Sequence, residues 1–358
     1  MKVLTVVGAR PQFVKAFPVS RRLRRDHEEV LVHTGQHYDE QLSAVFFDEL
    51  DIPEPDHHLG VGSGSHAAQT AAMMTGLEPL VESEAPDVVL VYGDTNSTLA
   101  AALVAAKAPT RLAHVEAGLR SFNRSMPEET NRVVTDHVAD LLFAPSQVAA
   151  GHLHDEGLDD GVVVTGDVMY DAVLAVRERS RARSTVLERL DLEPGGYVLA
   201  TVHRAGNTDD RERLAAIVAG LEASPRPVVL PAHPRTVRAL EAAGLRDRAR
   251  SAFRLVEPVG YLDFVRLLAA AERVATDSGG VQKEAFFLDT PCVTLRDETE
   301  WVETVAAGWN VLVGADADRI ATALAAERDR PPKPQPYGDG TAAERIVEAL
   351  GRRVAVVP

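Results

Sequence analysis

Thr-Asp-Ser-Gly-Gly-Val-Gln-Lys-Glu occupies residues 276–284, directly after a short apolar run that we interpret as a β-strand. The residues that follow have helical spacing, so the chain passes from strand to helix through Ser278, Gly279 and Gly280. Two glycines let a backbone approach an anion closely, and the free N–H groups of a helix N-terminus favour negative charge. The stretch therefore predicts a phosphate-binding turn in an α/β fold.

Glu284 lies six residues after Ser278, on the first turns of the predicted helix. A carboxylate at that place could accept hydrogen bonds from sugar hydroxyls, so the predicted ligand carries a phosphate and a ribose side by side, as a nucleotide does. The alternative is a glycine-rich helix cap followed by an ordinary solvated glutamate, and these nine residues do not decide between the two.

The rest of the chain repeats the alternation of short β-branched runs with longer segments of helical spacing. Continuous apolar strands between helices predict parallel sheets that are covered on both faces. Two such series occur, one ending near residue 168 and one starting near Tyr197 after the breaker at residues 194–196. We therefore predict an α/β protein with two doubly wound, Rossmann-like domains facing a cleft, residues 1–168 and 169–340, and a last helix in residues 341–358 as a candidate to pack back on the first domain. The predicted strands are residues 3–7, 30–33, 88–92, 112–115, 162–165, 197–202, 228–231, 273–276 and 293–295.

Bulk properties narrow the class of protein. A length of 358 residues suits two domains, and a net charge of −15 argues against nucleic-acid or acidic-membrane partners. The sequence contains no apolar run of membrane-spanning length, and its first residues are typical of a buried strand and not of a signal peptide. Cys292 is the single cysteine, which excludes an internal disulfide and a Cys-based zinc site. These features predict a cytoplasmic protein.

Polar residues gather where the predicted strands end, and ligands of open parallel sheets bind at the carboxyl ends of strands. Arg10 and Lys15 follow the first strand, Asp94 follows residues 88–92, and Glu116 follows residues 112–115. His203 follows the strand at residues 197–202, and the phosphate-binding turn follows another. We expect these residues to line the cleft.

Glu116, Asp94 and Glu128 are candidates for acid/base chemistry on a neutral sugar. A carboxylate at a strand end beside small residues is partly desolvated, which moves its pKa towards a useful range. For Asp94 and Glu128 the alternative roles are helix capping and first-turn charge. His203 could contact a phosphate or protonate a leaving group, and its alternative role is a structural hydrogen bond to a backbone carbonyl.

The sequence does not contain the common motifs of metal, ATP or dinucleotide binding. No His or Cys spacing typical of a metal site stands beside a carboxylate, and the ATP-binding loop Gly-x-x-x-x-Gly-Lys-Ser/Thr is not present. Gly-x-Gly-x-x-Gly does not follow the first strand either. We therefore expect neither a metal ion nor a dinucleotide cofactor.

Taken in order, these segments resemble the non-hydrolysing UDP-N-acetylglucosamine 2-epimerases. Each match is weak by itself, but the ordered set is specific and extends from the N-terminus to about residue 310. The matching segments are Gly-Ala-Arg-Pro-Gln at 8–12, Tyr-Gly-Asp-Thr-Asn at 92–96, His-Val-Glu-Ala-Gly-Leu-Arg at 114–120, Pro-Glu-Glu-Thr-Asn-Arg at 127–132, Thr-Asp-Ser-Gly-Gly at 276–280 with Glu284, and Arg-Asp-Glu-Thr-Glu-Trp-Val-Glu at 296–303.

The resemblance implies the GT-B architecture, a homodimer, and interconversion of UDP-GlcNAc and UDP-ManNAc without NAD or metal. UDP is first expelled as the C2 proton is removed, leaving 2-acetamidoglucal, and then adds back as a proton reaches the other face of C2. The family's catalytic acids and bases fall on Asp94, Glu116 and Glu128, and its histidine falls on His203, where it would support the departing phosphate. Its UDP contacts fall on Arg10, Lys15, Ser278, Gly279, Gly280 and Glu284, with Arg132 near the sugar or the diphosphate.

Other functions remain open at this stage. The motifs say little about substituents at C3 and C6, so the substrate could be a modified sugar such as UDP-2,3-diacetamido-2,3-dideoxy-glucuronate. A hydrolysing epimerase that releases free ManNAc, a retaining glycosyltransferase of the same fold and a non-catalytic nucleotide-sugar sensor are further alternatives. The three carboxylates argue against the sensor, which has no use for them.

The chain departs from the family's usual pattern at several positions. Gly206 stands where the family often has a glutamate, which removes one carboxylate near His203. Several members are activated by their own substrate through a second site with an Arg and Gln pair, and here the matching positions are Ala68 and Gln69. Asp39 also replaces a usual glutamine.

Substrate activation should therefore be weak or absent. We expect initial rates against UDP-GlcNAc concentration to follow a hyperbola, because the arginine of the second site is missing. A clearly sigmoidal curve would contradict this expectation.

Overall fold

The computed structural model describes residues 1–36, 53–327 and 332–354. The chain divides into two compact units. The first unit joins Met1–Ala172 with Gln335–Pro358, and the second unit is Val173–Pro334. In the part of the chain that the structure describes, no helix is long and apolar enough to cross a membrane.

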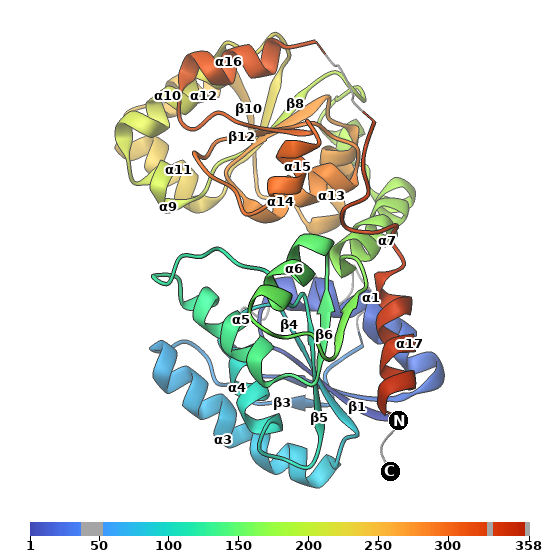
Figure 1. The fold of residues 1–358 in the computed structure, drawn as a ribbon. Coiled ribbons are helices and arrows are strands. Elements are labelled where there is room, and N and C mark those ends of the chain that lie inside the picture. Colours follow the sequence, from blue (N-terminus) through green and yellow to red (C-terminus); the bar gives the residue numbers. More distant parts are fainter. Residues whose placement is uncertain (37–52, 328–331, 355–358) are drawn as a thin grey trace. The chain divides into compact units, whose positions relative to one another are not determined.

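The first unit is built on a seven-stranded parallel sheet with the strand order β3-β2-β1-β4-β5-β6-β7. Leu4 and Val6 pack towards α3 and α4, whereas their neighbours Val3 and Val7 point to the opposite face and are equally buried. Helices therefore cover both faces, as the apolar strands predict. The strands are β1 (Lys2–Val7), β2 (Glu28–His33), β3 (His57–His58), β4 (Val88–Tyr92), β5 (Arg111–Val115), β6 (Leu141–Ala144) and β7 (Val162–Val164), and the helices are α1 (Arg10–Asp26), α3 (His66–Glu84), α4 (Asn96–Ala105), α5 (Pro127–Val138), α6 (Gln147–Asp155) and α17 (Ala342–Val354) (Figure 1).

The second unit repeats this plan on a six-stranded parallel sheet with the order β10-β9-β8-β11-β12-β13. Its core joins side chains of the central strands to α10, α11 and α16. α7 (Val168–Arg183) contains the boundary between the units. The strands are β8 (Val198–Thr201), β9 (Val228–Pro231), β10 (Phe253–Val256), β11 (Arg273–Thr276), β12 (Cys292–Thr294) and β13 (Asn310–Leu312), and the helices are α8 (Val186–Arg189), α9 (Ala205–Thr208), α10 (Arg211–Glu222), α11 (Pro234–Ala242), α12 (Arg246–Ala252), α13 (Tyr261–Ala270), α14 (Gly279–Phe287), α15 (Val302–Ala306) and α16 (Ala317–Ala325).

Each sheet has one place where the strand order reverses. In the first unit this place lies between β1 and β4, and in the second between β8 and β11. Loops diverge at such a switch point and leave a crevice outside the carboxyl ends of the strands. Arg10, Asp94, His203 and Ser278 follow β1, β4, β8 and β11, which are the strands on either side of the two switch points.

The last helix returns to the first unit. α17 packs against α1, and the two are seen together in Figure 1. The carboxylate of Asp171 accepts hydrogen bonds from the N–H groups of Ala342 (3.1 Å) and Ala343 (2.9 Å), so it caps α17 from a residue far away in sequence.

Most predicted strands are present with boundaries shifted by one or two residues. Four strands escape the sequence interpretation, namely β3, β6, β10 and β13. They are short, and β13 is an edge strand whose Val311 is half exposed. The segment between β7 and β8 contains two helices, α7 and α8, which are separated at Ser184 and Thr185.

Gly118 offers a test of local packing. Its φ is +79°, and a Cβ there would lie 2.2 Å from the carbonyl oxygen of Ala149. Gly157 has the same φ of +79° with nothing near its Cβ position. We expect Gly157→Ala to lower the free energy of unfolding by about 1 kcal/mol, the cost of the left-handed backbone. Gly118→Ala should cost at least about 3 kcal/mol because the clash adds to it. Urea denaturation of both variants measures the difference, and equal losses would contradict the predicted clash.

Candidate functional site

Two candidate catalytic residues lie on the loops after β4 and β5 in the first unit. Glu116 follows β5 with a φ of +72°, in the left-handed region that non-glycine residues rarely occupy. Its backbone N–H and that of Ala117 both donate to the carbonyl of Phe143, at 3.1 Å each. Its carboxylate is nearly buried and forms an ion pair with Lys15 of α1. The structure therefore brings together two of the residues selected from the sequence.

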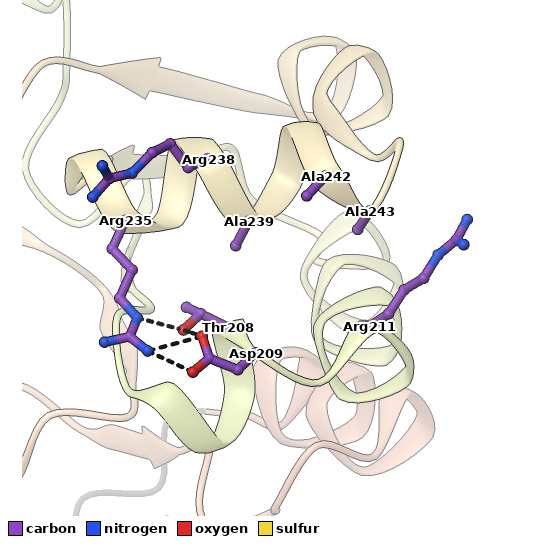
Figure 2. Close-up of a pocket in the computed structure, with 8 residues that line it drawn as sticks. All are labelled: Thr208, Asp209, Arg211, Arg235, Arg238, Ala239, Ala242 and Ala243. Atoms are coloured by element: carbon purple, nitrogen blue, oxygen red, sulfur yellow. Dashed lines mark hydrogen bonds and ion pairs between the residues drawn. The ribbon is translucent and has the colours of Figure 1, made fainter.

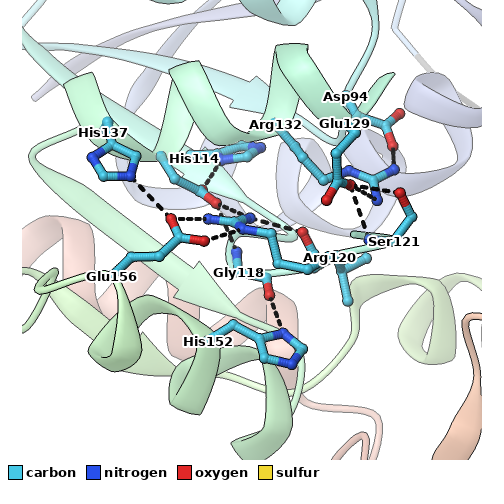
Figure 3. Close-up of polar contacts among 12 residues, drawn as sticks. Asp94, His114, Gly118, Arg120, Ser121, Glu129, Arg132, His137, His152 and Glu156 are labelled. Carbon is cyan, nitrogen blue, oxygen red and sulfur yellow. Dashed lines mark hydrogen bonds and ion pairs between the residues drawn. The ribbon is translucent and has the colours of Figure 1, made fainter. Parts of the chain in front are cut away.

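Asp94 is joined to Arg132 of α5 by an ion pair. Arg132 also contacts Glu129 (Nη1 to Oε2, 3.1 Å). The main chain beside Asp94 is fixed as well, because Asn131 donates from Nδ2 to the Asp94 carbonyl at 2.9 Å. Figure 3 shows Asp94, Arg132 and Glu129 converging.

The two adjacent glutamates of α5 differ sharply. Glu128 is exposed, one helical turn before Arg132 and on the same face. Glu129 is buried, and it accepts hydrogen bonds from the N–H groups of Ser121 and Phe122, at 2.9 Å each. Burial opposes its ionisation, but these hydrogen bonds and the charge of Arg132 hold the pKa of Glu129 below its usual range. Glu129 thus anchors the preceding loop, a role that the sequence interpretation missed.

The loop after β1 contains Arg10, the first residue of α1. Gln12, which was not selected from the sequence, fixes this loop. Its Oε1 accepts from the N–H of Gly8 (2.8 Å) and of Ala9 (3.1 Å), and its Nε2 donates to the carbonyl of Tyr92 (2.8 Å). Since Tyr92 ends β4, this one amide ties together the two loops on either side of the switch point.

In the second unit, Ser278 is the N-cap of α14 and accepts from the N–H of Val281 at 3.4 Å. Gly280 is exposed, and a Cβ there would make only an ordinary contact of 3.9 Å with the hydroxyl oxygen of Ser278. Gly279 has a different constraint, because a Cβ there would lie 2.3 Å from Oε1 of Glu300.

Glu284 is buried, and its Oε1 accepts a hydrogen bond from the hydroxyl of Tyr261 at 2.8 Å.

His203 follows β8, next to the strand that leads to Ser278. The buried carboxylate of Asp277 holds its loop, accepting from the N–H of His203 (3.1 Å), the N–H of Arg204 (3.0 Å) and Nδ2 of Asn207 (3.2 Å). Nδ1 of His203 lies 3.4 Å from Oδ1 of Asp277. Although nearly half of the imidazole surface is exposed, desolvation lowers the pKa of His203, and Asp277 offsets part of this effect. The lowered pKa favours the neutral imidazole of His203 before a phosphate binds.

The departures from the family pattern can be located in part. Gly206 lies in α9 with nothing near its Cβ position, so packing does not dictate the residue there. Ala68 is exposed on α3. Gln69 is engaged internally, with Nε2 donating to the carbonyl of Gly62 (2.7 Å) and Oε1 accepting from Asn96 (2.8 Å). Asp39 lies outside the described residues.

One recess of about 380 Å³ lies between α9, α10 and α11. Figure 2 shows Arg235 turned towards Asp209 inside it, where Nη2 contacts Oδ2 at 2.6 Å, while Arg211 points away. Its cationic lining is thus partly neutralised from within. None of the residues selected from the sequence lines this recess, whose walls are Thr208, Asp209, Arg211, Arg235, Arg238, Ala239, Ala242 and Ala243. Within residues 1–36, 53–327 and 332–354, no three His, Cys, Asp or Glu side chains gather as metal ligands would.

Comparison with known proteins places this geometry in a family. The model of a family described as UDP-N-acetylglucosamine 2-epimerase matches residues 21–351. The chain belongs to the UDP-N-acetylglucosamine 2-epimerase family. An epimerase homologue from Methanococcus maripaludis is 48% identical over 98% of this chain and 99% of its own length. A UDP-2,3-diacetamido-2,3-dideoxy-D-glucuronate 2-epimerase from Pseudomonas aeruginosa is 46% identical over 98% of this chain and 100% of its own.

Solved structures of epimerases share the two-unit fold. The UDP-GlcNAc 2-epimerase of Methanocaldococcus jannaschii, crystallised with UDP-GlcNAc and UDP, superimposes with a TM-score of 0.86 at 42% identity, covering 98% of this chain and 100% of that one. The predicted fold class, two doubly wound Rossmann-like units of the GT-B type, is therefore confirmed, as is the predicted family. The roles of the individual site residues in this epimerase stay predictions.

Asp277→Asn tests the electrostatic link to His203 in this epimerase. The pKa of His203 should lie below 6.5 in the unaltered protein and fall further in the variant, because the carboxylate that favours the imidazolium is lost. Proton NMR titration of the imidazole Cε1 proton, assigned with His203→Asn, gives both values. A rise of this pKa in Asp277→Asn would show that the carboxylate does not act on the ring.

Proposed function

We propose that this epimerase interconverts UDP-GlcNAc and UDP-ManNAc by elimination and re-addition of UDP. A base removes the C2 proton, the C1–O bond breaks, and its electron pair leaves with the β-phosphate of UDP. The resulting 2-acetamidoglucal then takes back UDP at C1 and a proton on the opposite face of C2. No oxidant is required, because both half-reactions only move protons and the phosphate.

The observation that carries the proposal is the separation of the carboxylates in the first unit. Glu116 is paired with Lys15, Asp94 is paired with Arg132, and Glu128 is exposed on α5. Inversion at C2 requires one group to take a proton from one face and another group to deliver it to the opposite face. Carboxylates on three different elements, each in its own surroundings, suit those separate roles.

The second unit supplies the features that a diphosphate leaving group requires. Ser278 and Gly280 begin α14, whose N-terminus favours negative charge, and Glu284 is suited to the ribose hydroxyls. We assign to His203 the support of the departing phosphate, which becomes more negative as the bond breaks. Because desolvation lowers the pKa of this histidine before binding, the negative phosphate itself would favour a proton on the ring. Arg10, Lys15 and Arg132 supply positive charge from the first unit.

A modified sugar is the second candidate substrate. The Pseudomonas aeruginosa diacetamido-glucuronate epimerase is 46% identical to this chain, against 42% for the Methanocaldococcus jannaschii UDP-GlcNAc epimerase. Both matches cover 98% of this chain, so overall identity does not separate the two substrates. The cytoplasmic location and the homodimeric state expected from the sequence belong to the same proposal, and the net charge of −15 continues to disfavour nucleic-acid partners.

Proton NMR in D₂O tests the function directly. With UDP-GlcNAc we expect UDP-ManNAc carrying deuterium at C2, since the returning proton comes from solvent. Glu116→Gln and Asp94→Asn should each slow this exchange by about 100-fold or more. Glu82→Gln, an exposed carboxylate of α3, is the control and should be unaffected.

The alternatives give different spectra in the same experiment. Exchange only with the diacetamido-glucuronate substrate would assign the second candidate. Free ManNAc would reveal a hydrolysing enzyme. Saturable UDP binding without exchange in any UDP-sugar would overturn the proposal in favour of a transferase or a sensor.

A further inference from the structure

A buried imidazole lies directly behind the candidate catalytic loops of the first unit. His114 of β5 is fully buried, with Nδ1 2.7 Å from Oδ1 of Asp136 and Nε2 2.7 Å from the carbonyl oxygen of Gly93. A backbone carbonyl can only accept a hydrogen bond, and an ionised carboxylate can only accept one. Both ring nitrogens of His114 must therefore carry protons, which makes the side chain an imidazolium cation.

Asp136 is ionised in these surroundings. Its Oδ2 accepts from Nη1 of Arg120 (2.7 Å) and from the N–H of Gly118 (3.1 Å). Burial opposes the charge, but His114 and Arg120 together hold the pKa of Asp136 below its usual range. The network continues from Arg120 to the exposed Glu156 (Nε to Oε1, 2.6 Å), so two cations face two carboxylates (Figure 3).

Asp136 and His114 contact both of the loops that carry the candidate catalytic residues. Through His114, Asp136 holds the carbonyl of Gly93, which immediately precedes Asp94. Through its other oxygen it holds the N–H of Gly118, two residues after Glu116. Asp136 itself belongs to α5, one turn after Arg132, the partner of Asp94. One carboxylate therefore connects the three elements that carry Asp94, Glu116 and Glu128.

The two loops turn sharply, and the loop after β5 does so through an unfavourable backbone conformation at Glu116. Gly93 and Gly118 have φ values of +63° and +79°, and Glu116, a non-glycine residue, has +72°. A left-handed non-glycine residue persists only where the surrounding structure fixes it. His114 has no accessible surface and uses both of its nitrogens, so it acts through the loops and not on a substrate.

We propose that the Asp136–His114 pair is a positioning element that sets the relative placement of Asp94 and Glu116 for proton transfer at C2. The inference rests on the proposed epimerisation, because it concerns the alignment of the groups that carry it out.

Asp136→Asn is the principal test. The amide cannot accept from all three donors and turns an N–H₂ towards one of them. We expect kcat for C2 deuterium exchange to fall about 100-fold, the cost of a displacement of about 1 Å at reacting groups. The dissociation constant for UDP, measured calorimetrically, should stay within about twofold because the second unit is untouched.

Glu156→Gln is the matched control, since it alters the same ion network without contacting Gly93, Gly118 or His114. Its kcat should stay within about twofold of the unaltered protein. Nitrogen-15 NMR of labelled histidine adds a readout of charge. His114 should show two protonated nitrogens in the unaltered protein and lose the Nδ1 proton in Asp136→Asn.

A second pair of variants keeps the test decisive if Asp136→Asn fails to fold. His114→Gln can keep the bond to the Gly93 carbonyl, whereas His114→Asn can keep only the bond to Asp136. We expect His114→Gln to retain more activity than His114→Asn. The inference is overturned if Asp136→Asn matches Glu156→Gln in kcat, or if His114→Asn is the more active of its pair. An unaltered protein that exchanges no C2 proton would instead refute the proposed function, and the nitrogen-15 spectrum would still show whether His114 carries two protons.

Discussion

Parallel strand pairing is the constraint on which the rest of this protein depends. A parallel sheet covered by helices shields its central strands from solvent, so β1, β4 and β8 are largely apolar and every residue of β11 is buried. Chemistry can then reside only beyond the carboxyl ends of the strands. The reversal of strand order fixes which of those ends have room for a ligand, and it does so once in each sheet. Strand order, more than any single motif, thus decides where polar residues can contact a ligand.

The arrangement of charge follows from that restriction. The chain is strongly acidic, yet Lys15 and Arg132 lie directly against Glu116 and Asp94. Buried ion pairs contribute little net stability, because the loss of hydration offsets their attraction. They do hold side chains in defined places, which a proton transfer requires. In the first unit these ion pairs cost desolvation free energy and fix the placement of side chains. The stability of the unit comes from its apolar core.

Much of this organisation could be predicted from the sequence, because it is local. Asp94, Glu116 and His203 each follow a continuous apolar strand, and Ser278 begins a helix after another, so a strand-by-strand interpretation finds them. β3, β6, β10 and β13 were missed because two to four residues carry too little pattern to stand out from their flanks.

Other features depend on contacts that only the folded chain creates. Glu128 and Glu129 are neighbours in one helical turn, and a rotation of one residue buries the second and exposes the first. The importance of Asp136 was equally hidden, since it lies within a helix and its partners come from two distant loops. The left-handed backbone conformation of Glu116 could not be predicted from its residue type, because glutamate has no preference for that conformation.

The return of α17 to the first unit has a consequence for biosynthesis. The second unit is one continuous segment, Val173–Pro334, so all of its contacts are available once residue 334 has left the ribosome. The first unit begins earlier but finishes later, because the helix that covers α1 and is capped by Asp171 comes last. Because synthesis proceeds from the N-terminus, the N-terminal unit of a protein usually folds first. Here the second unit can complete its fold while the first unit still exposes the apolar surface of α1. The N-terminal part of the nascent chain therefore needs protection from aggregation for the longest time.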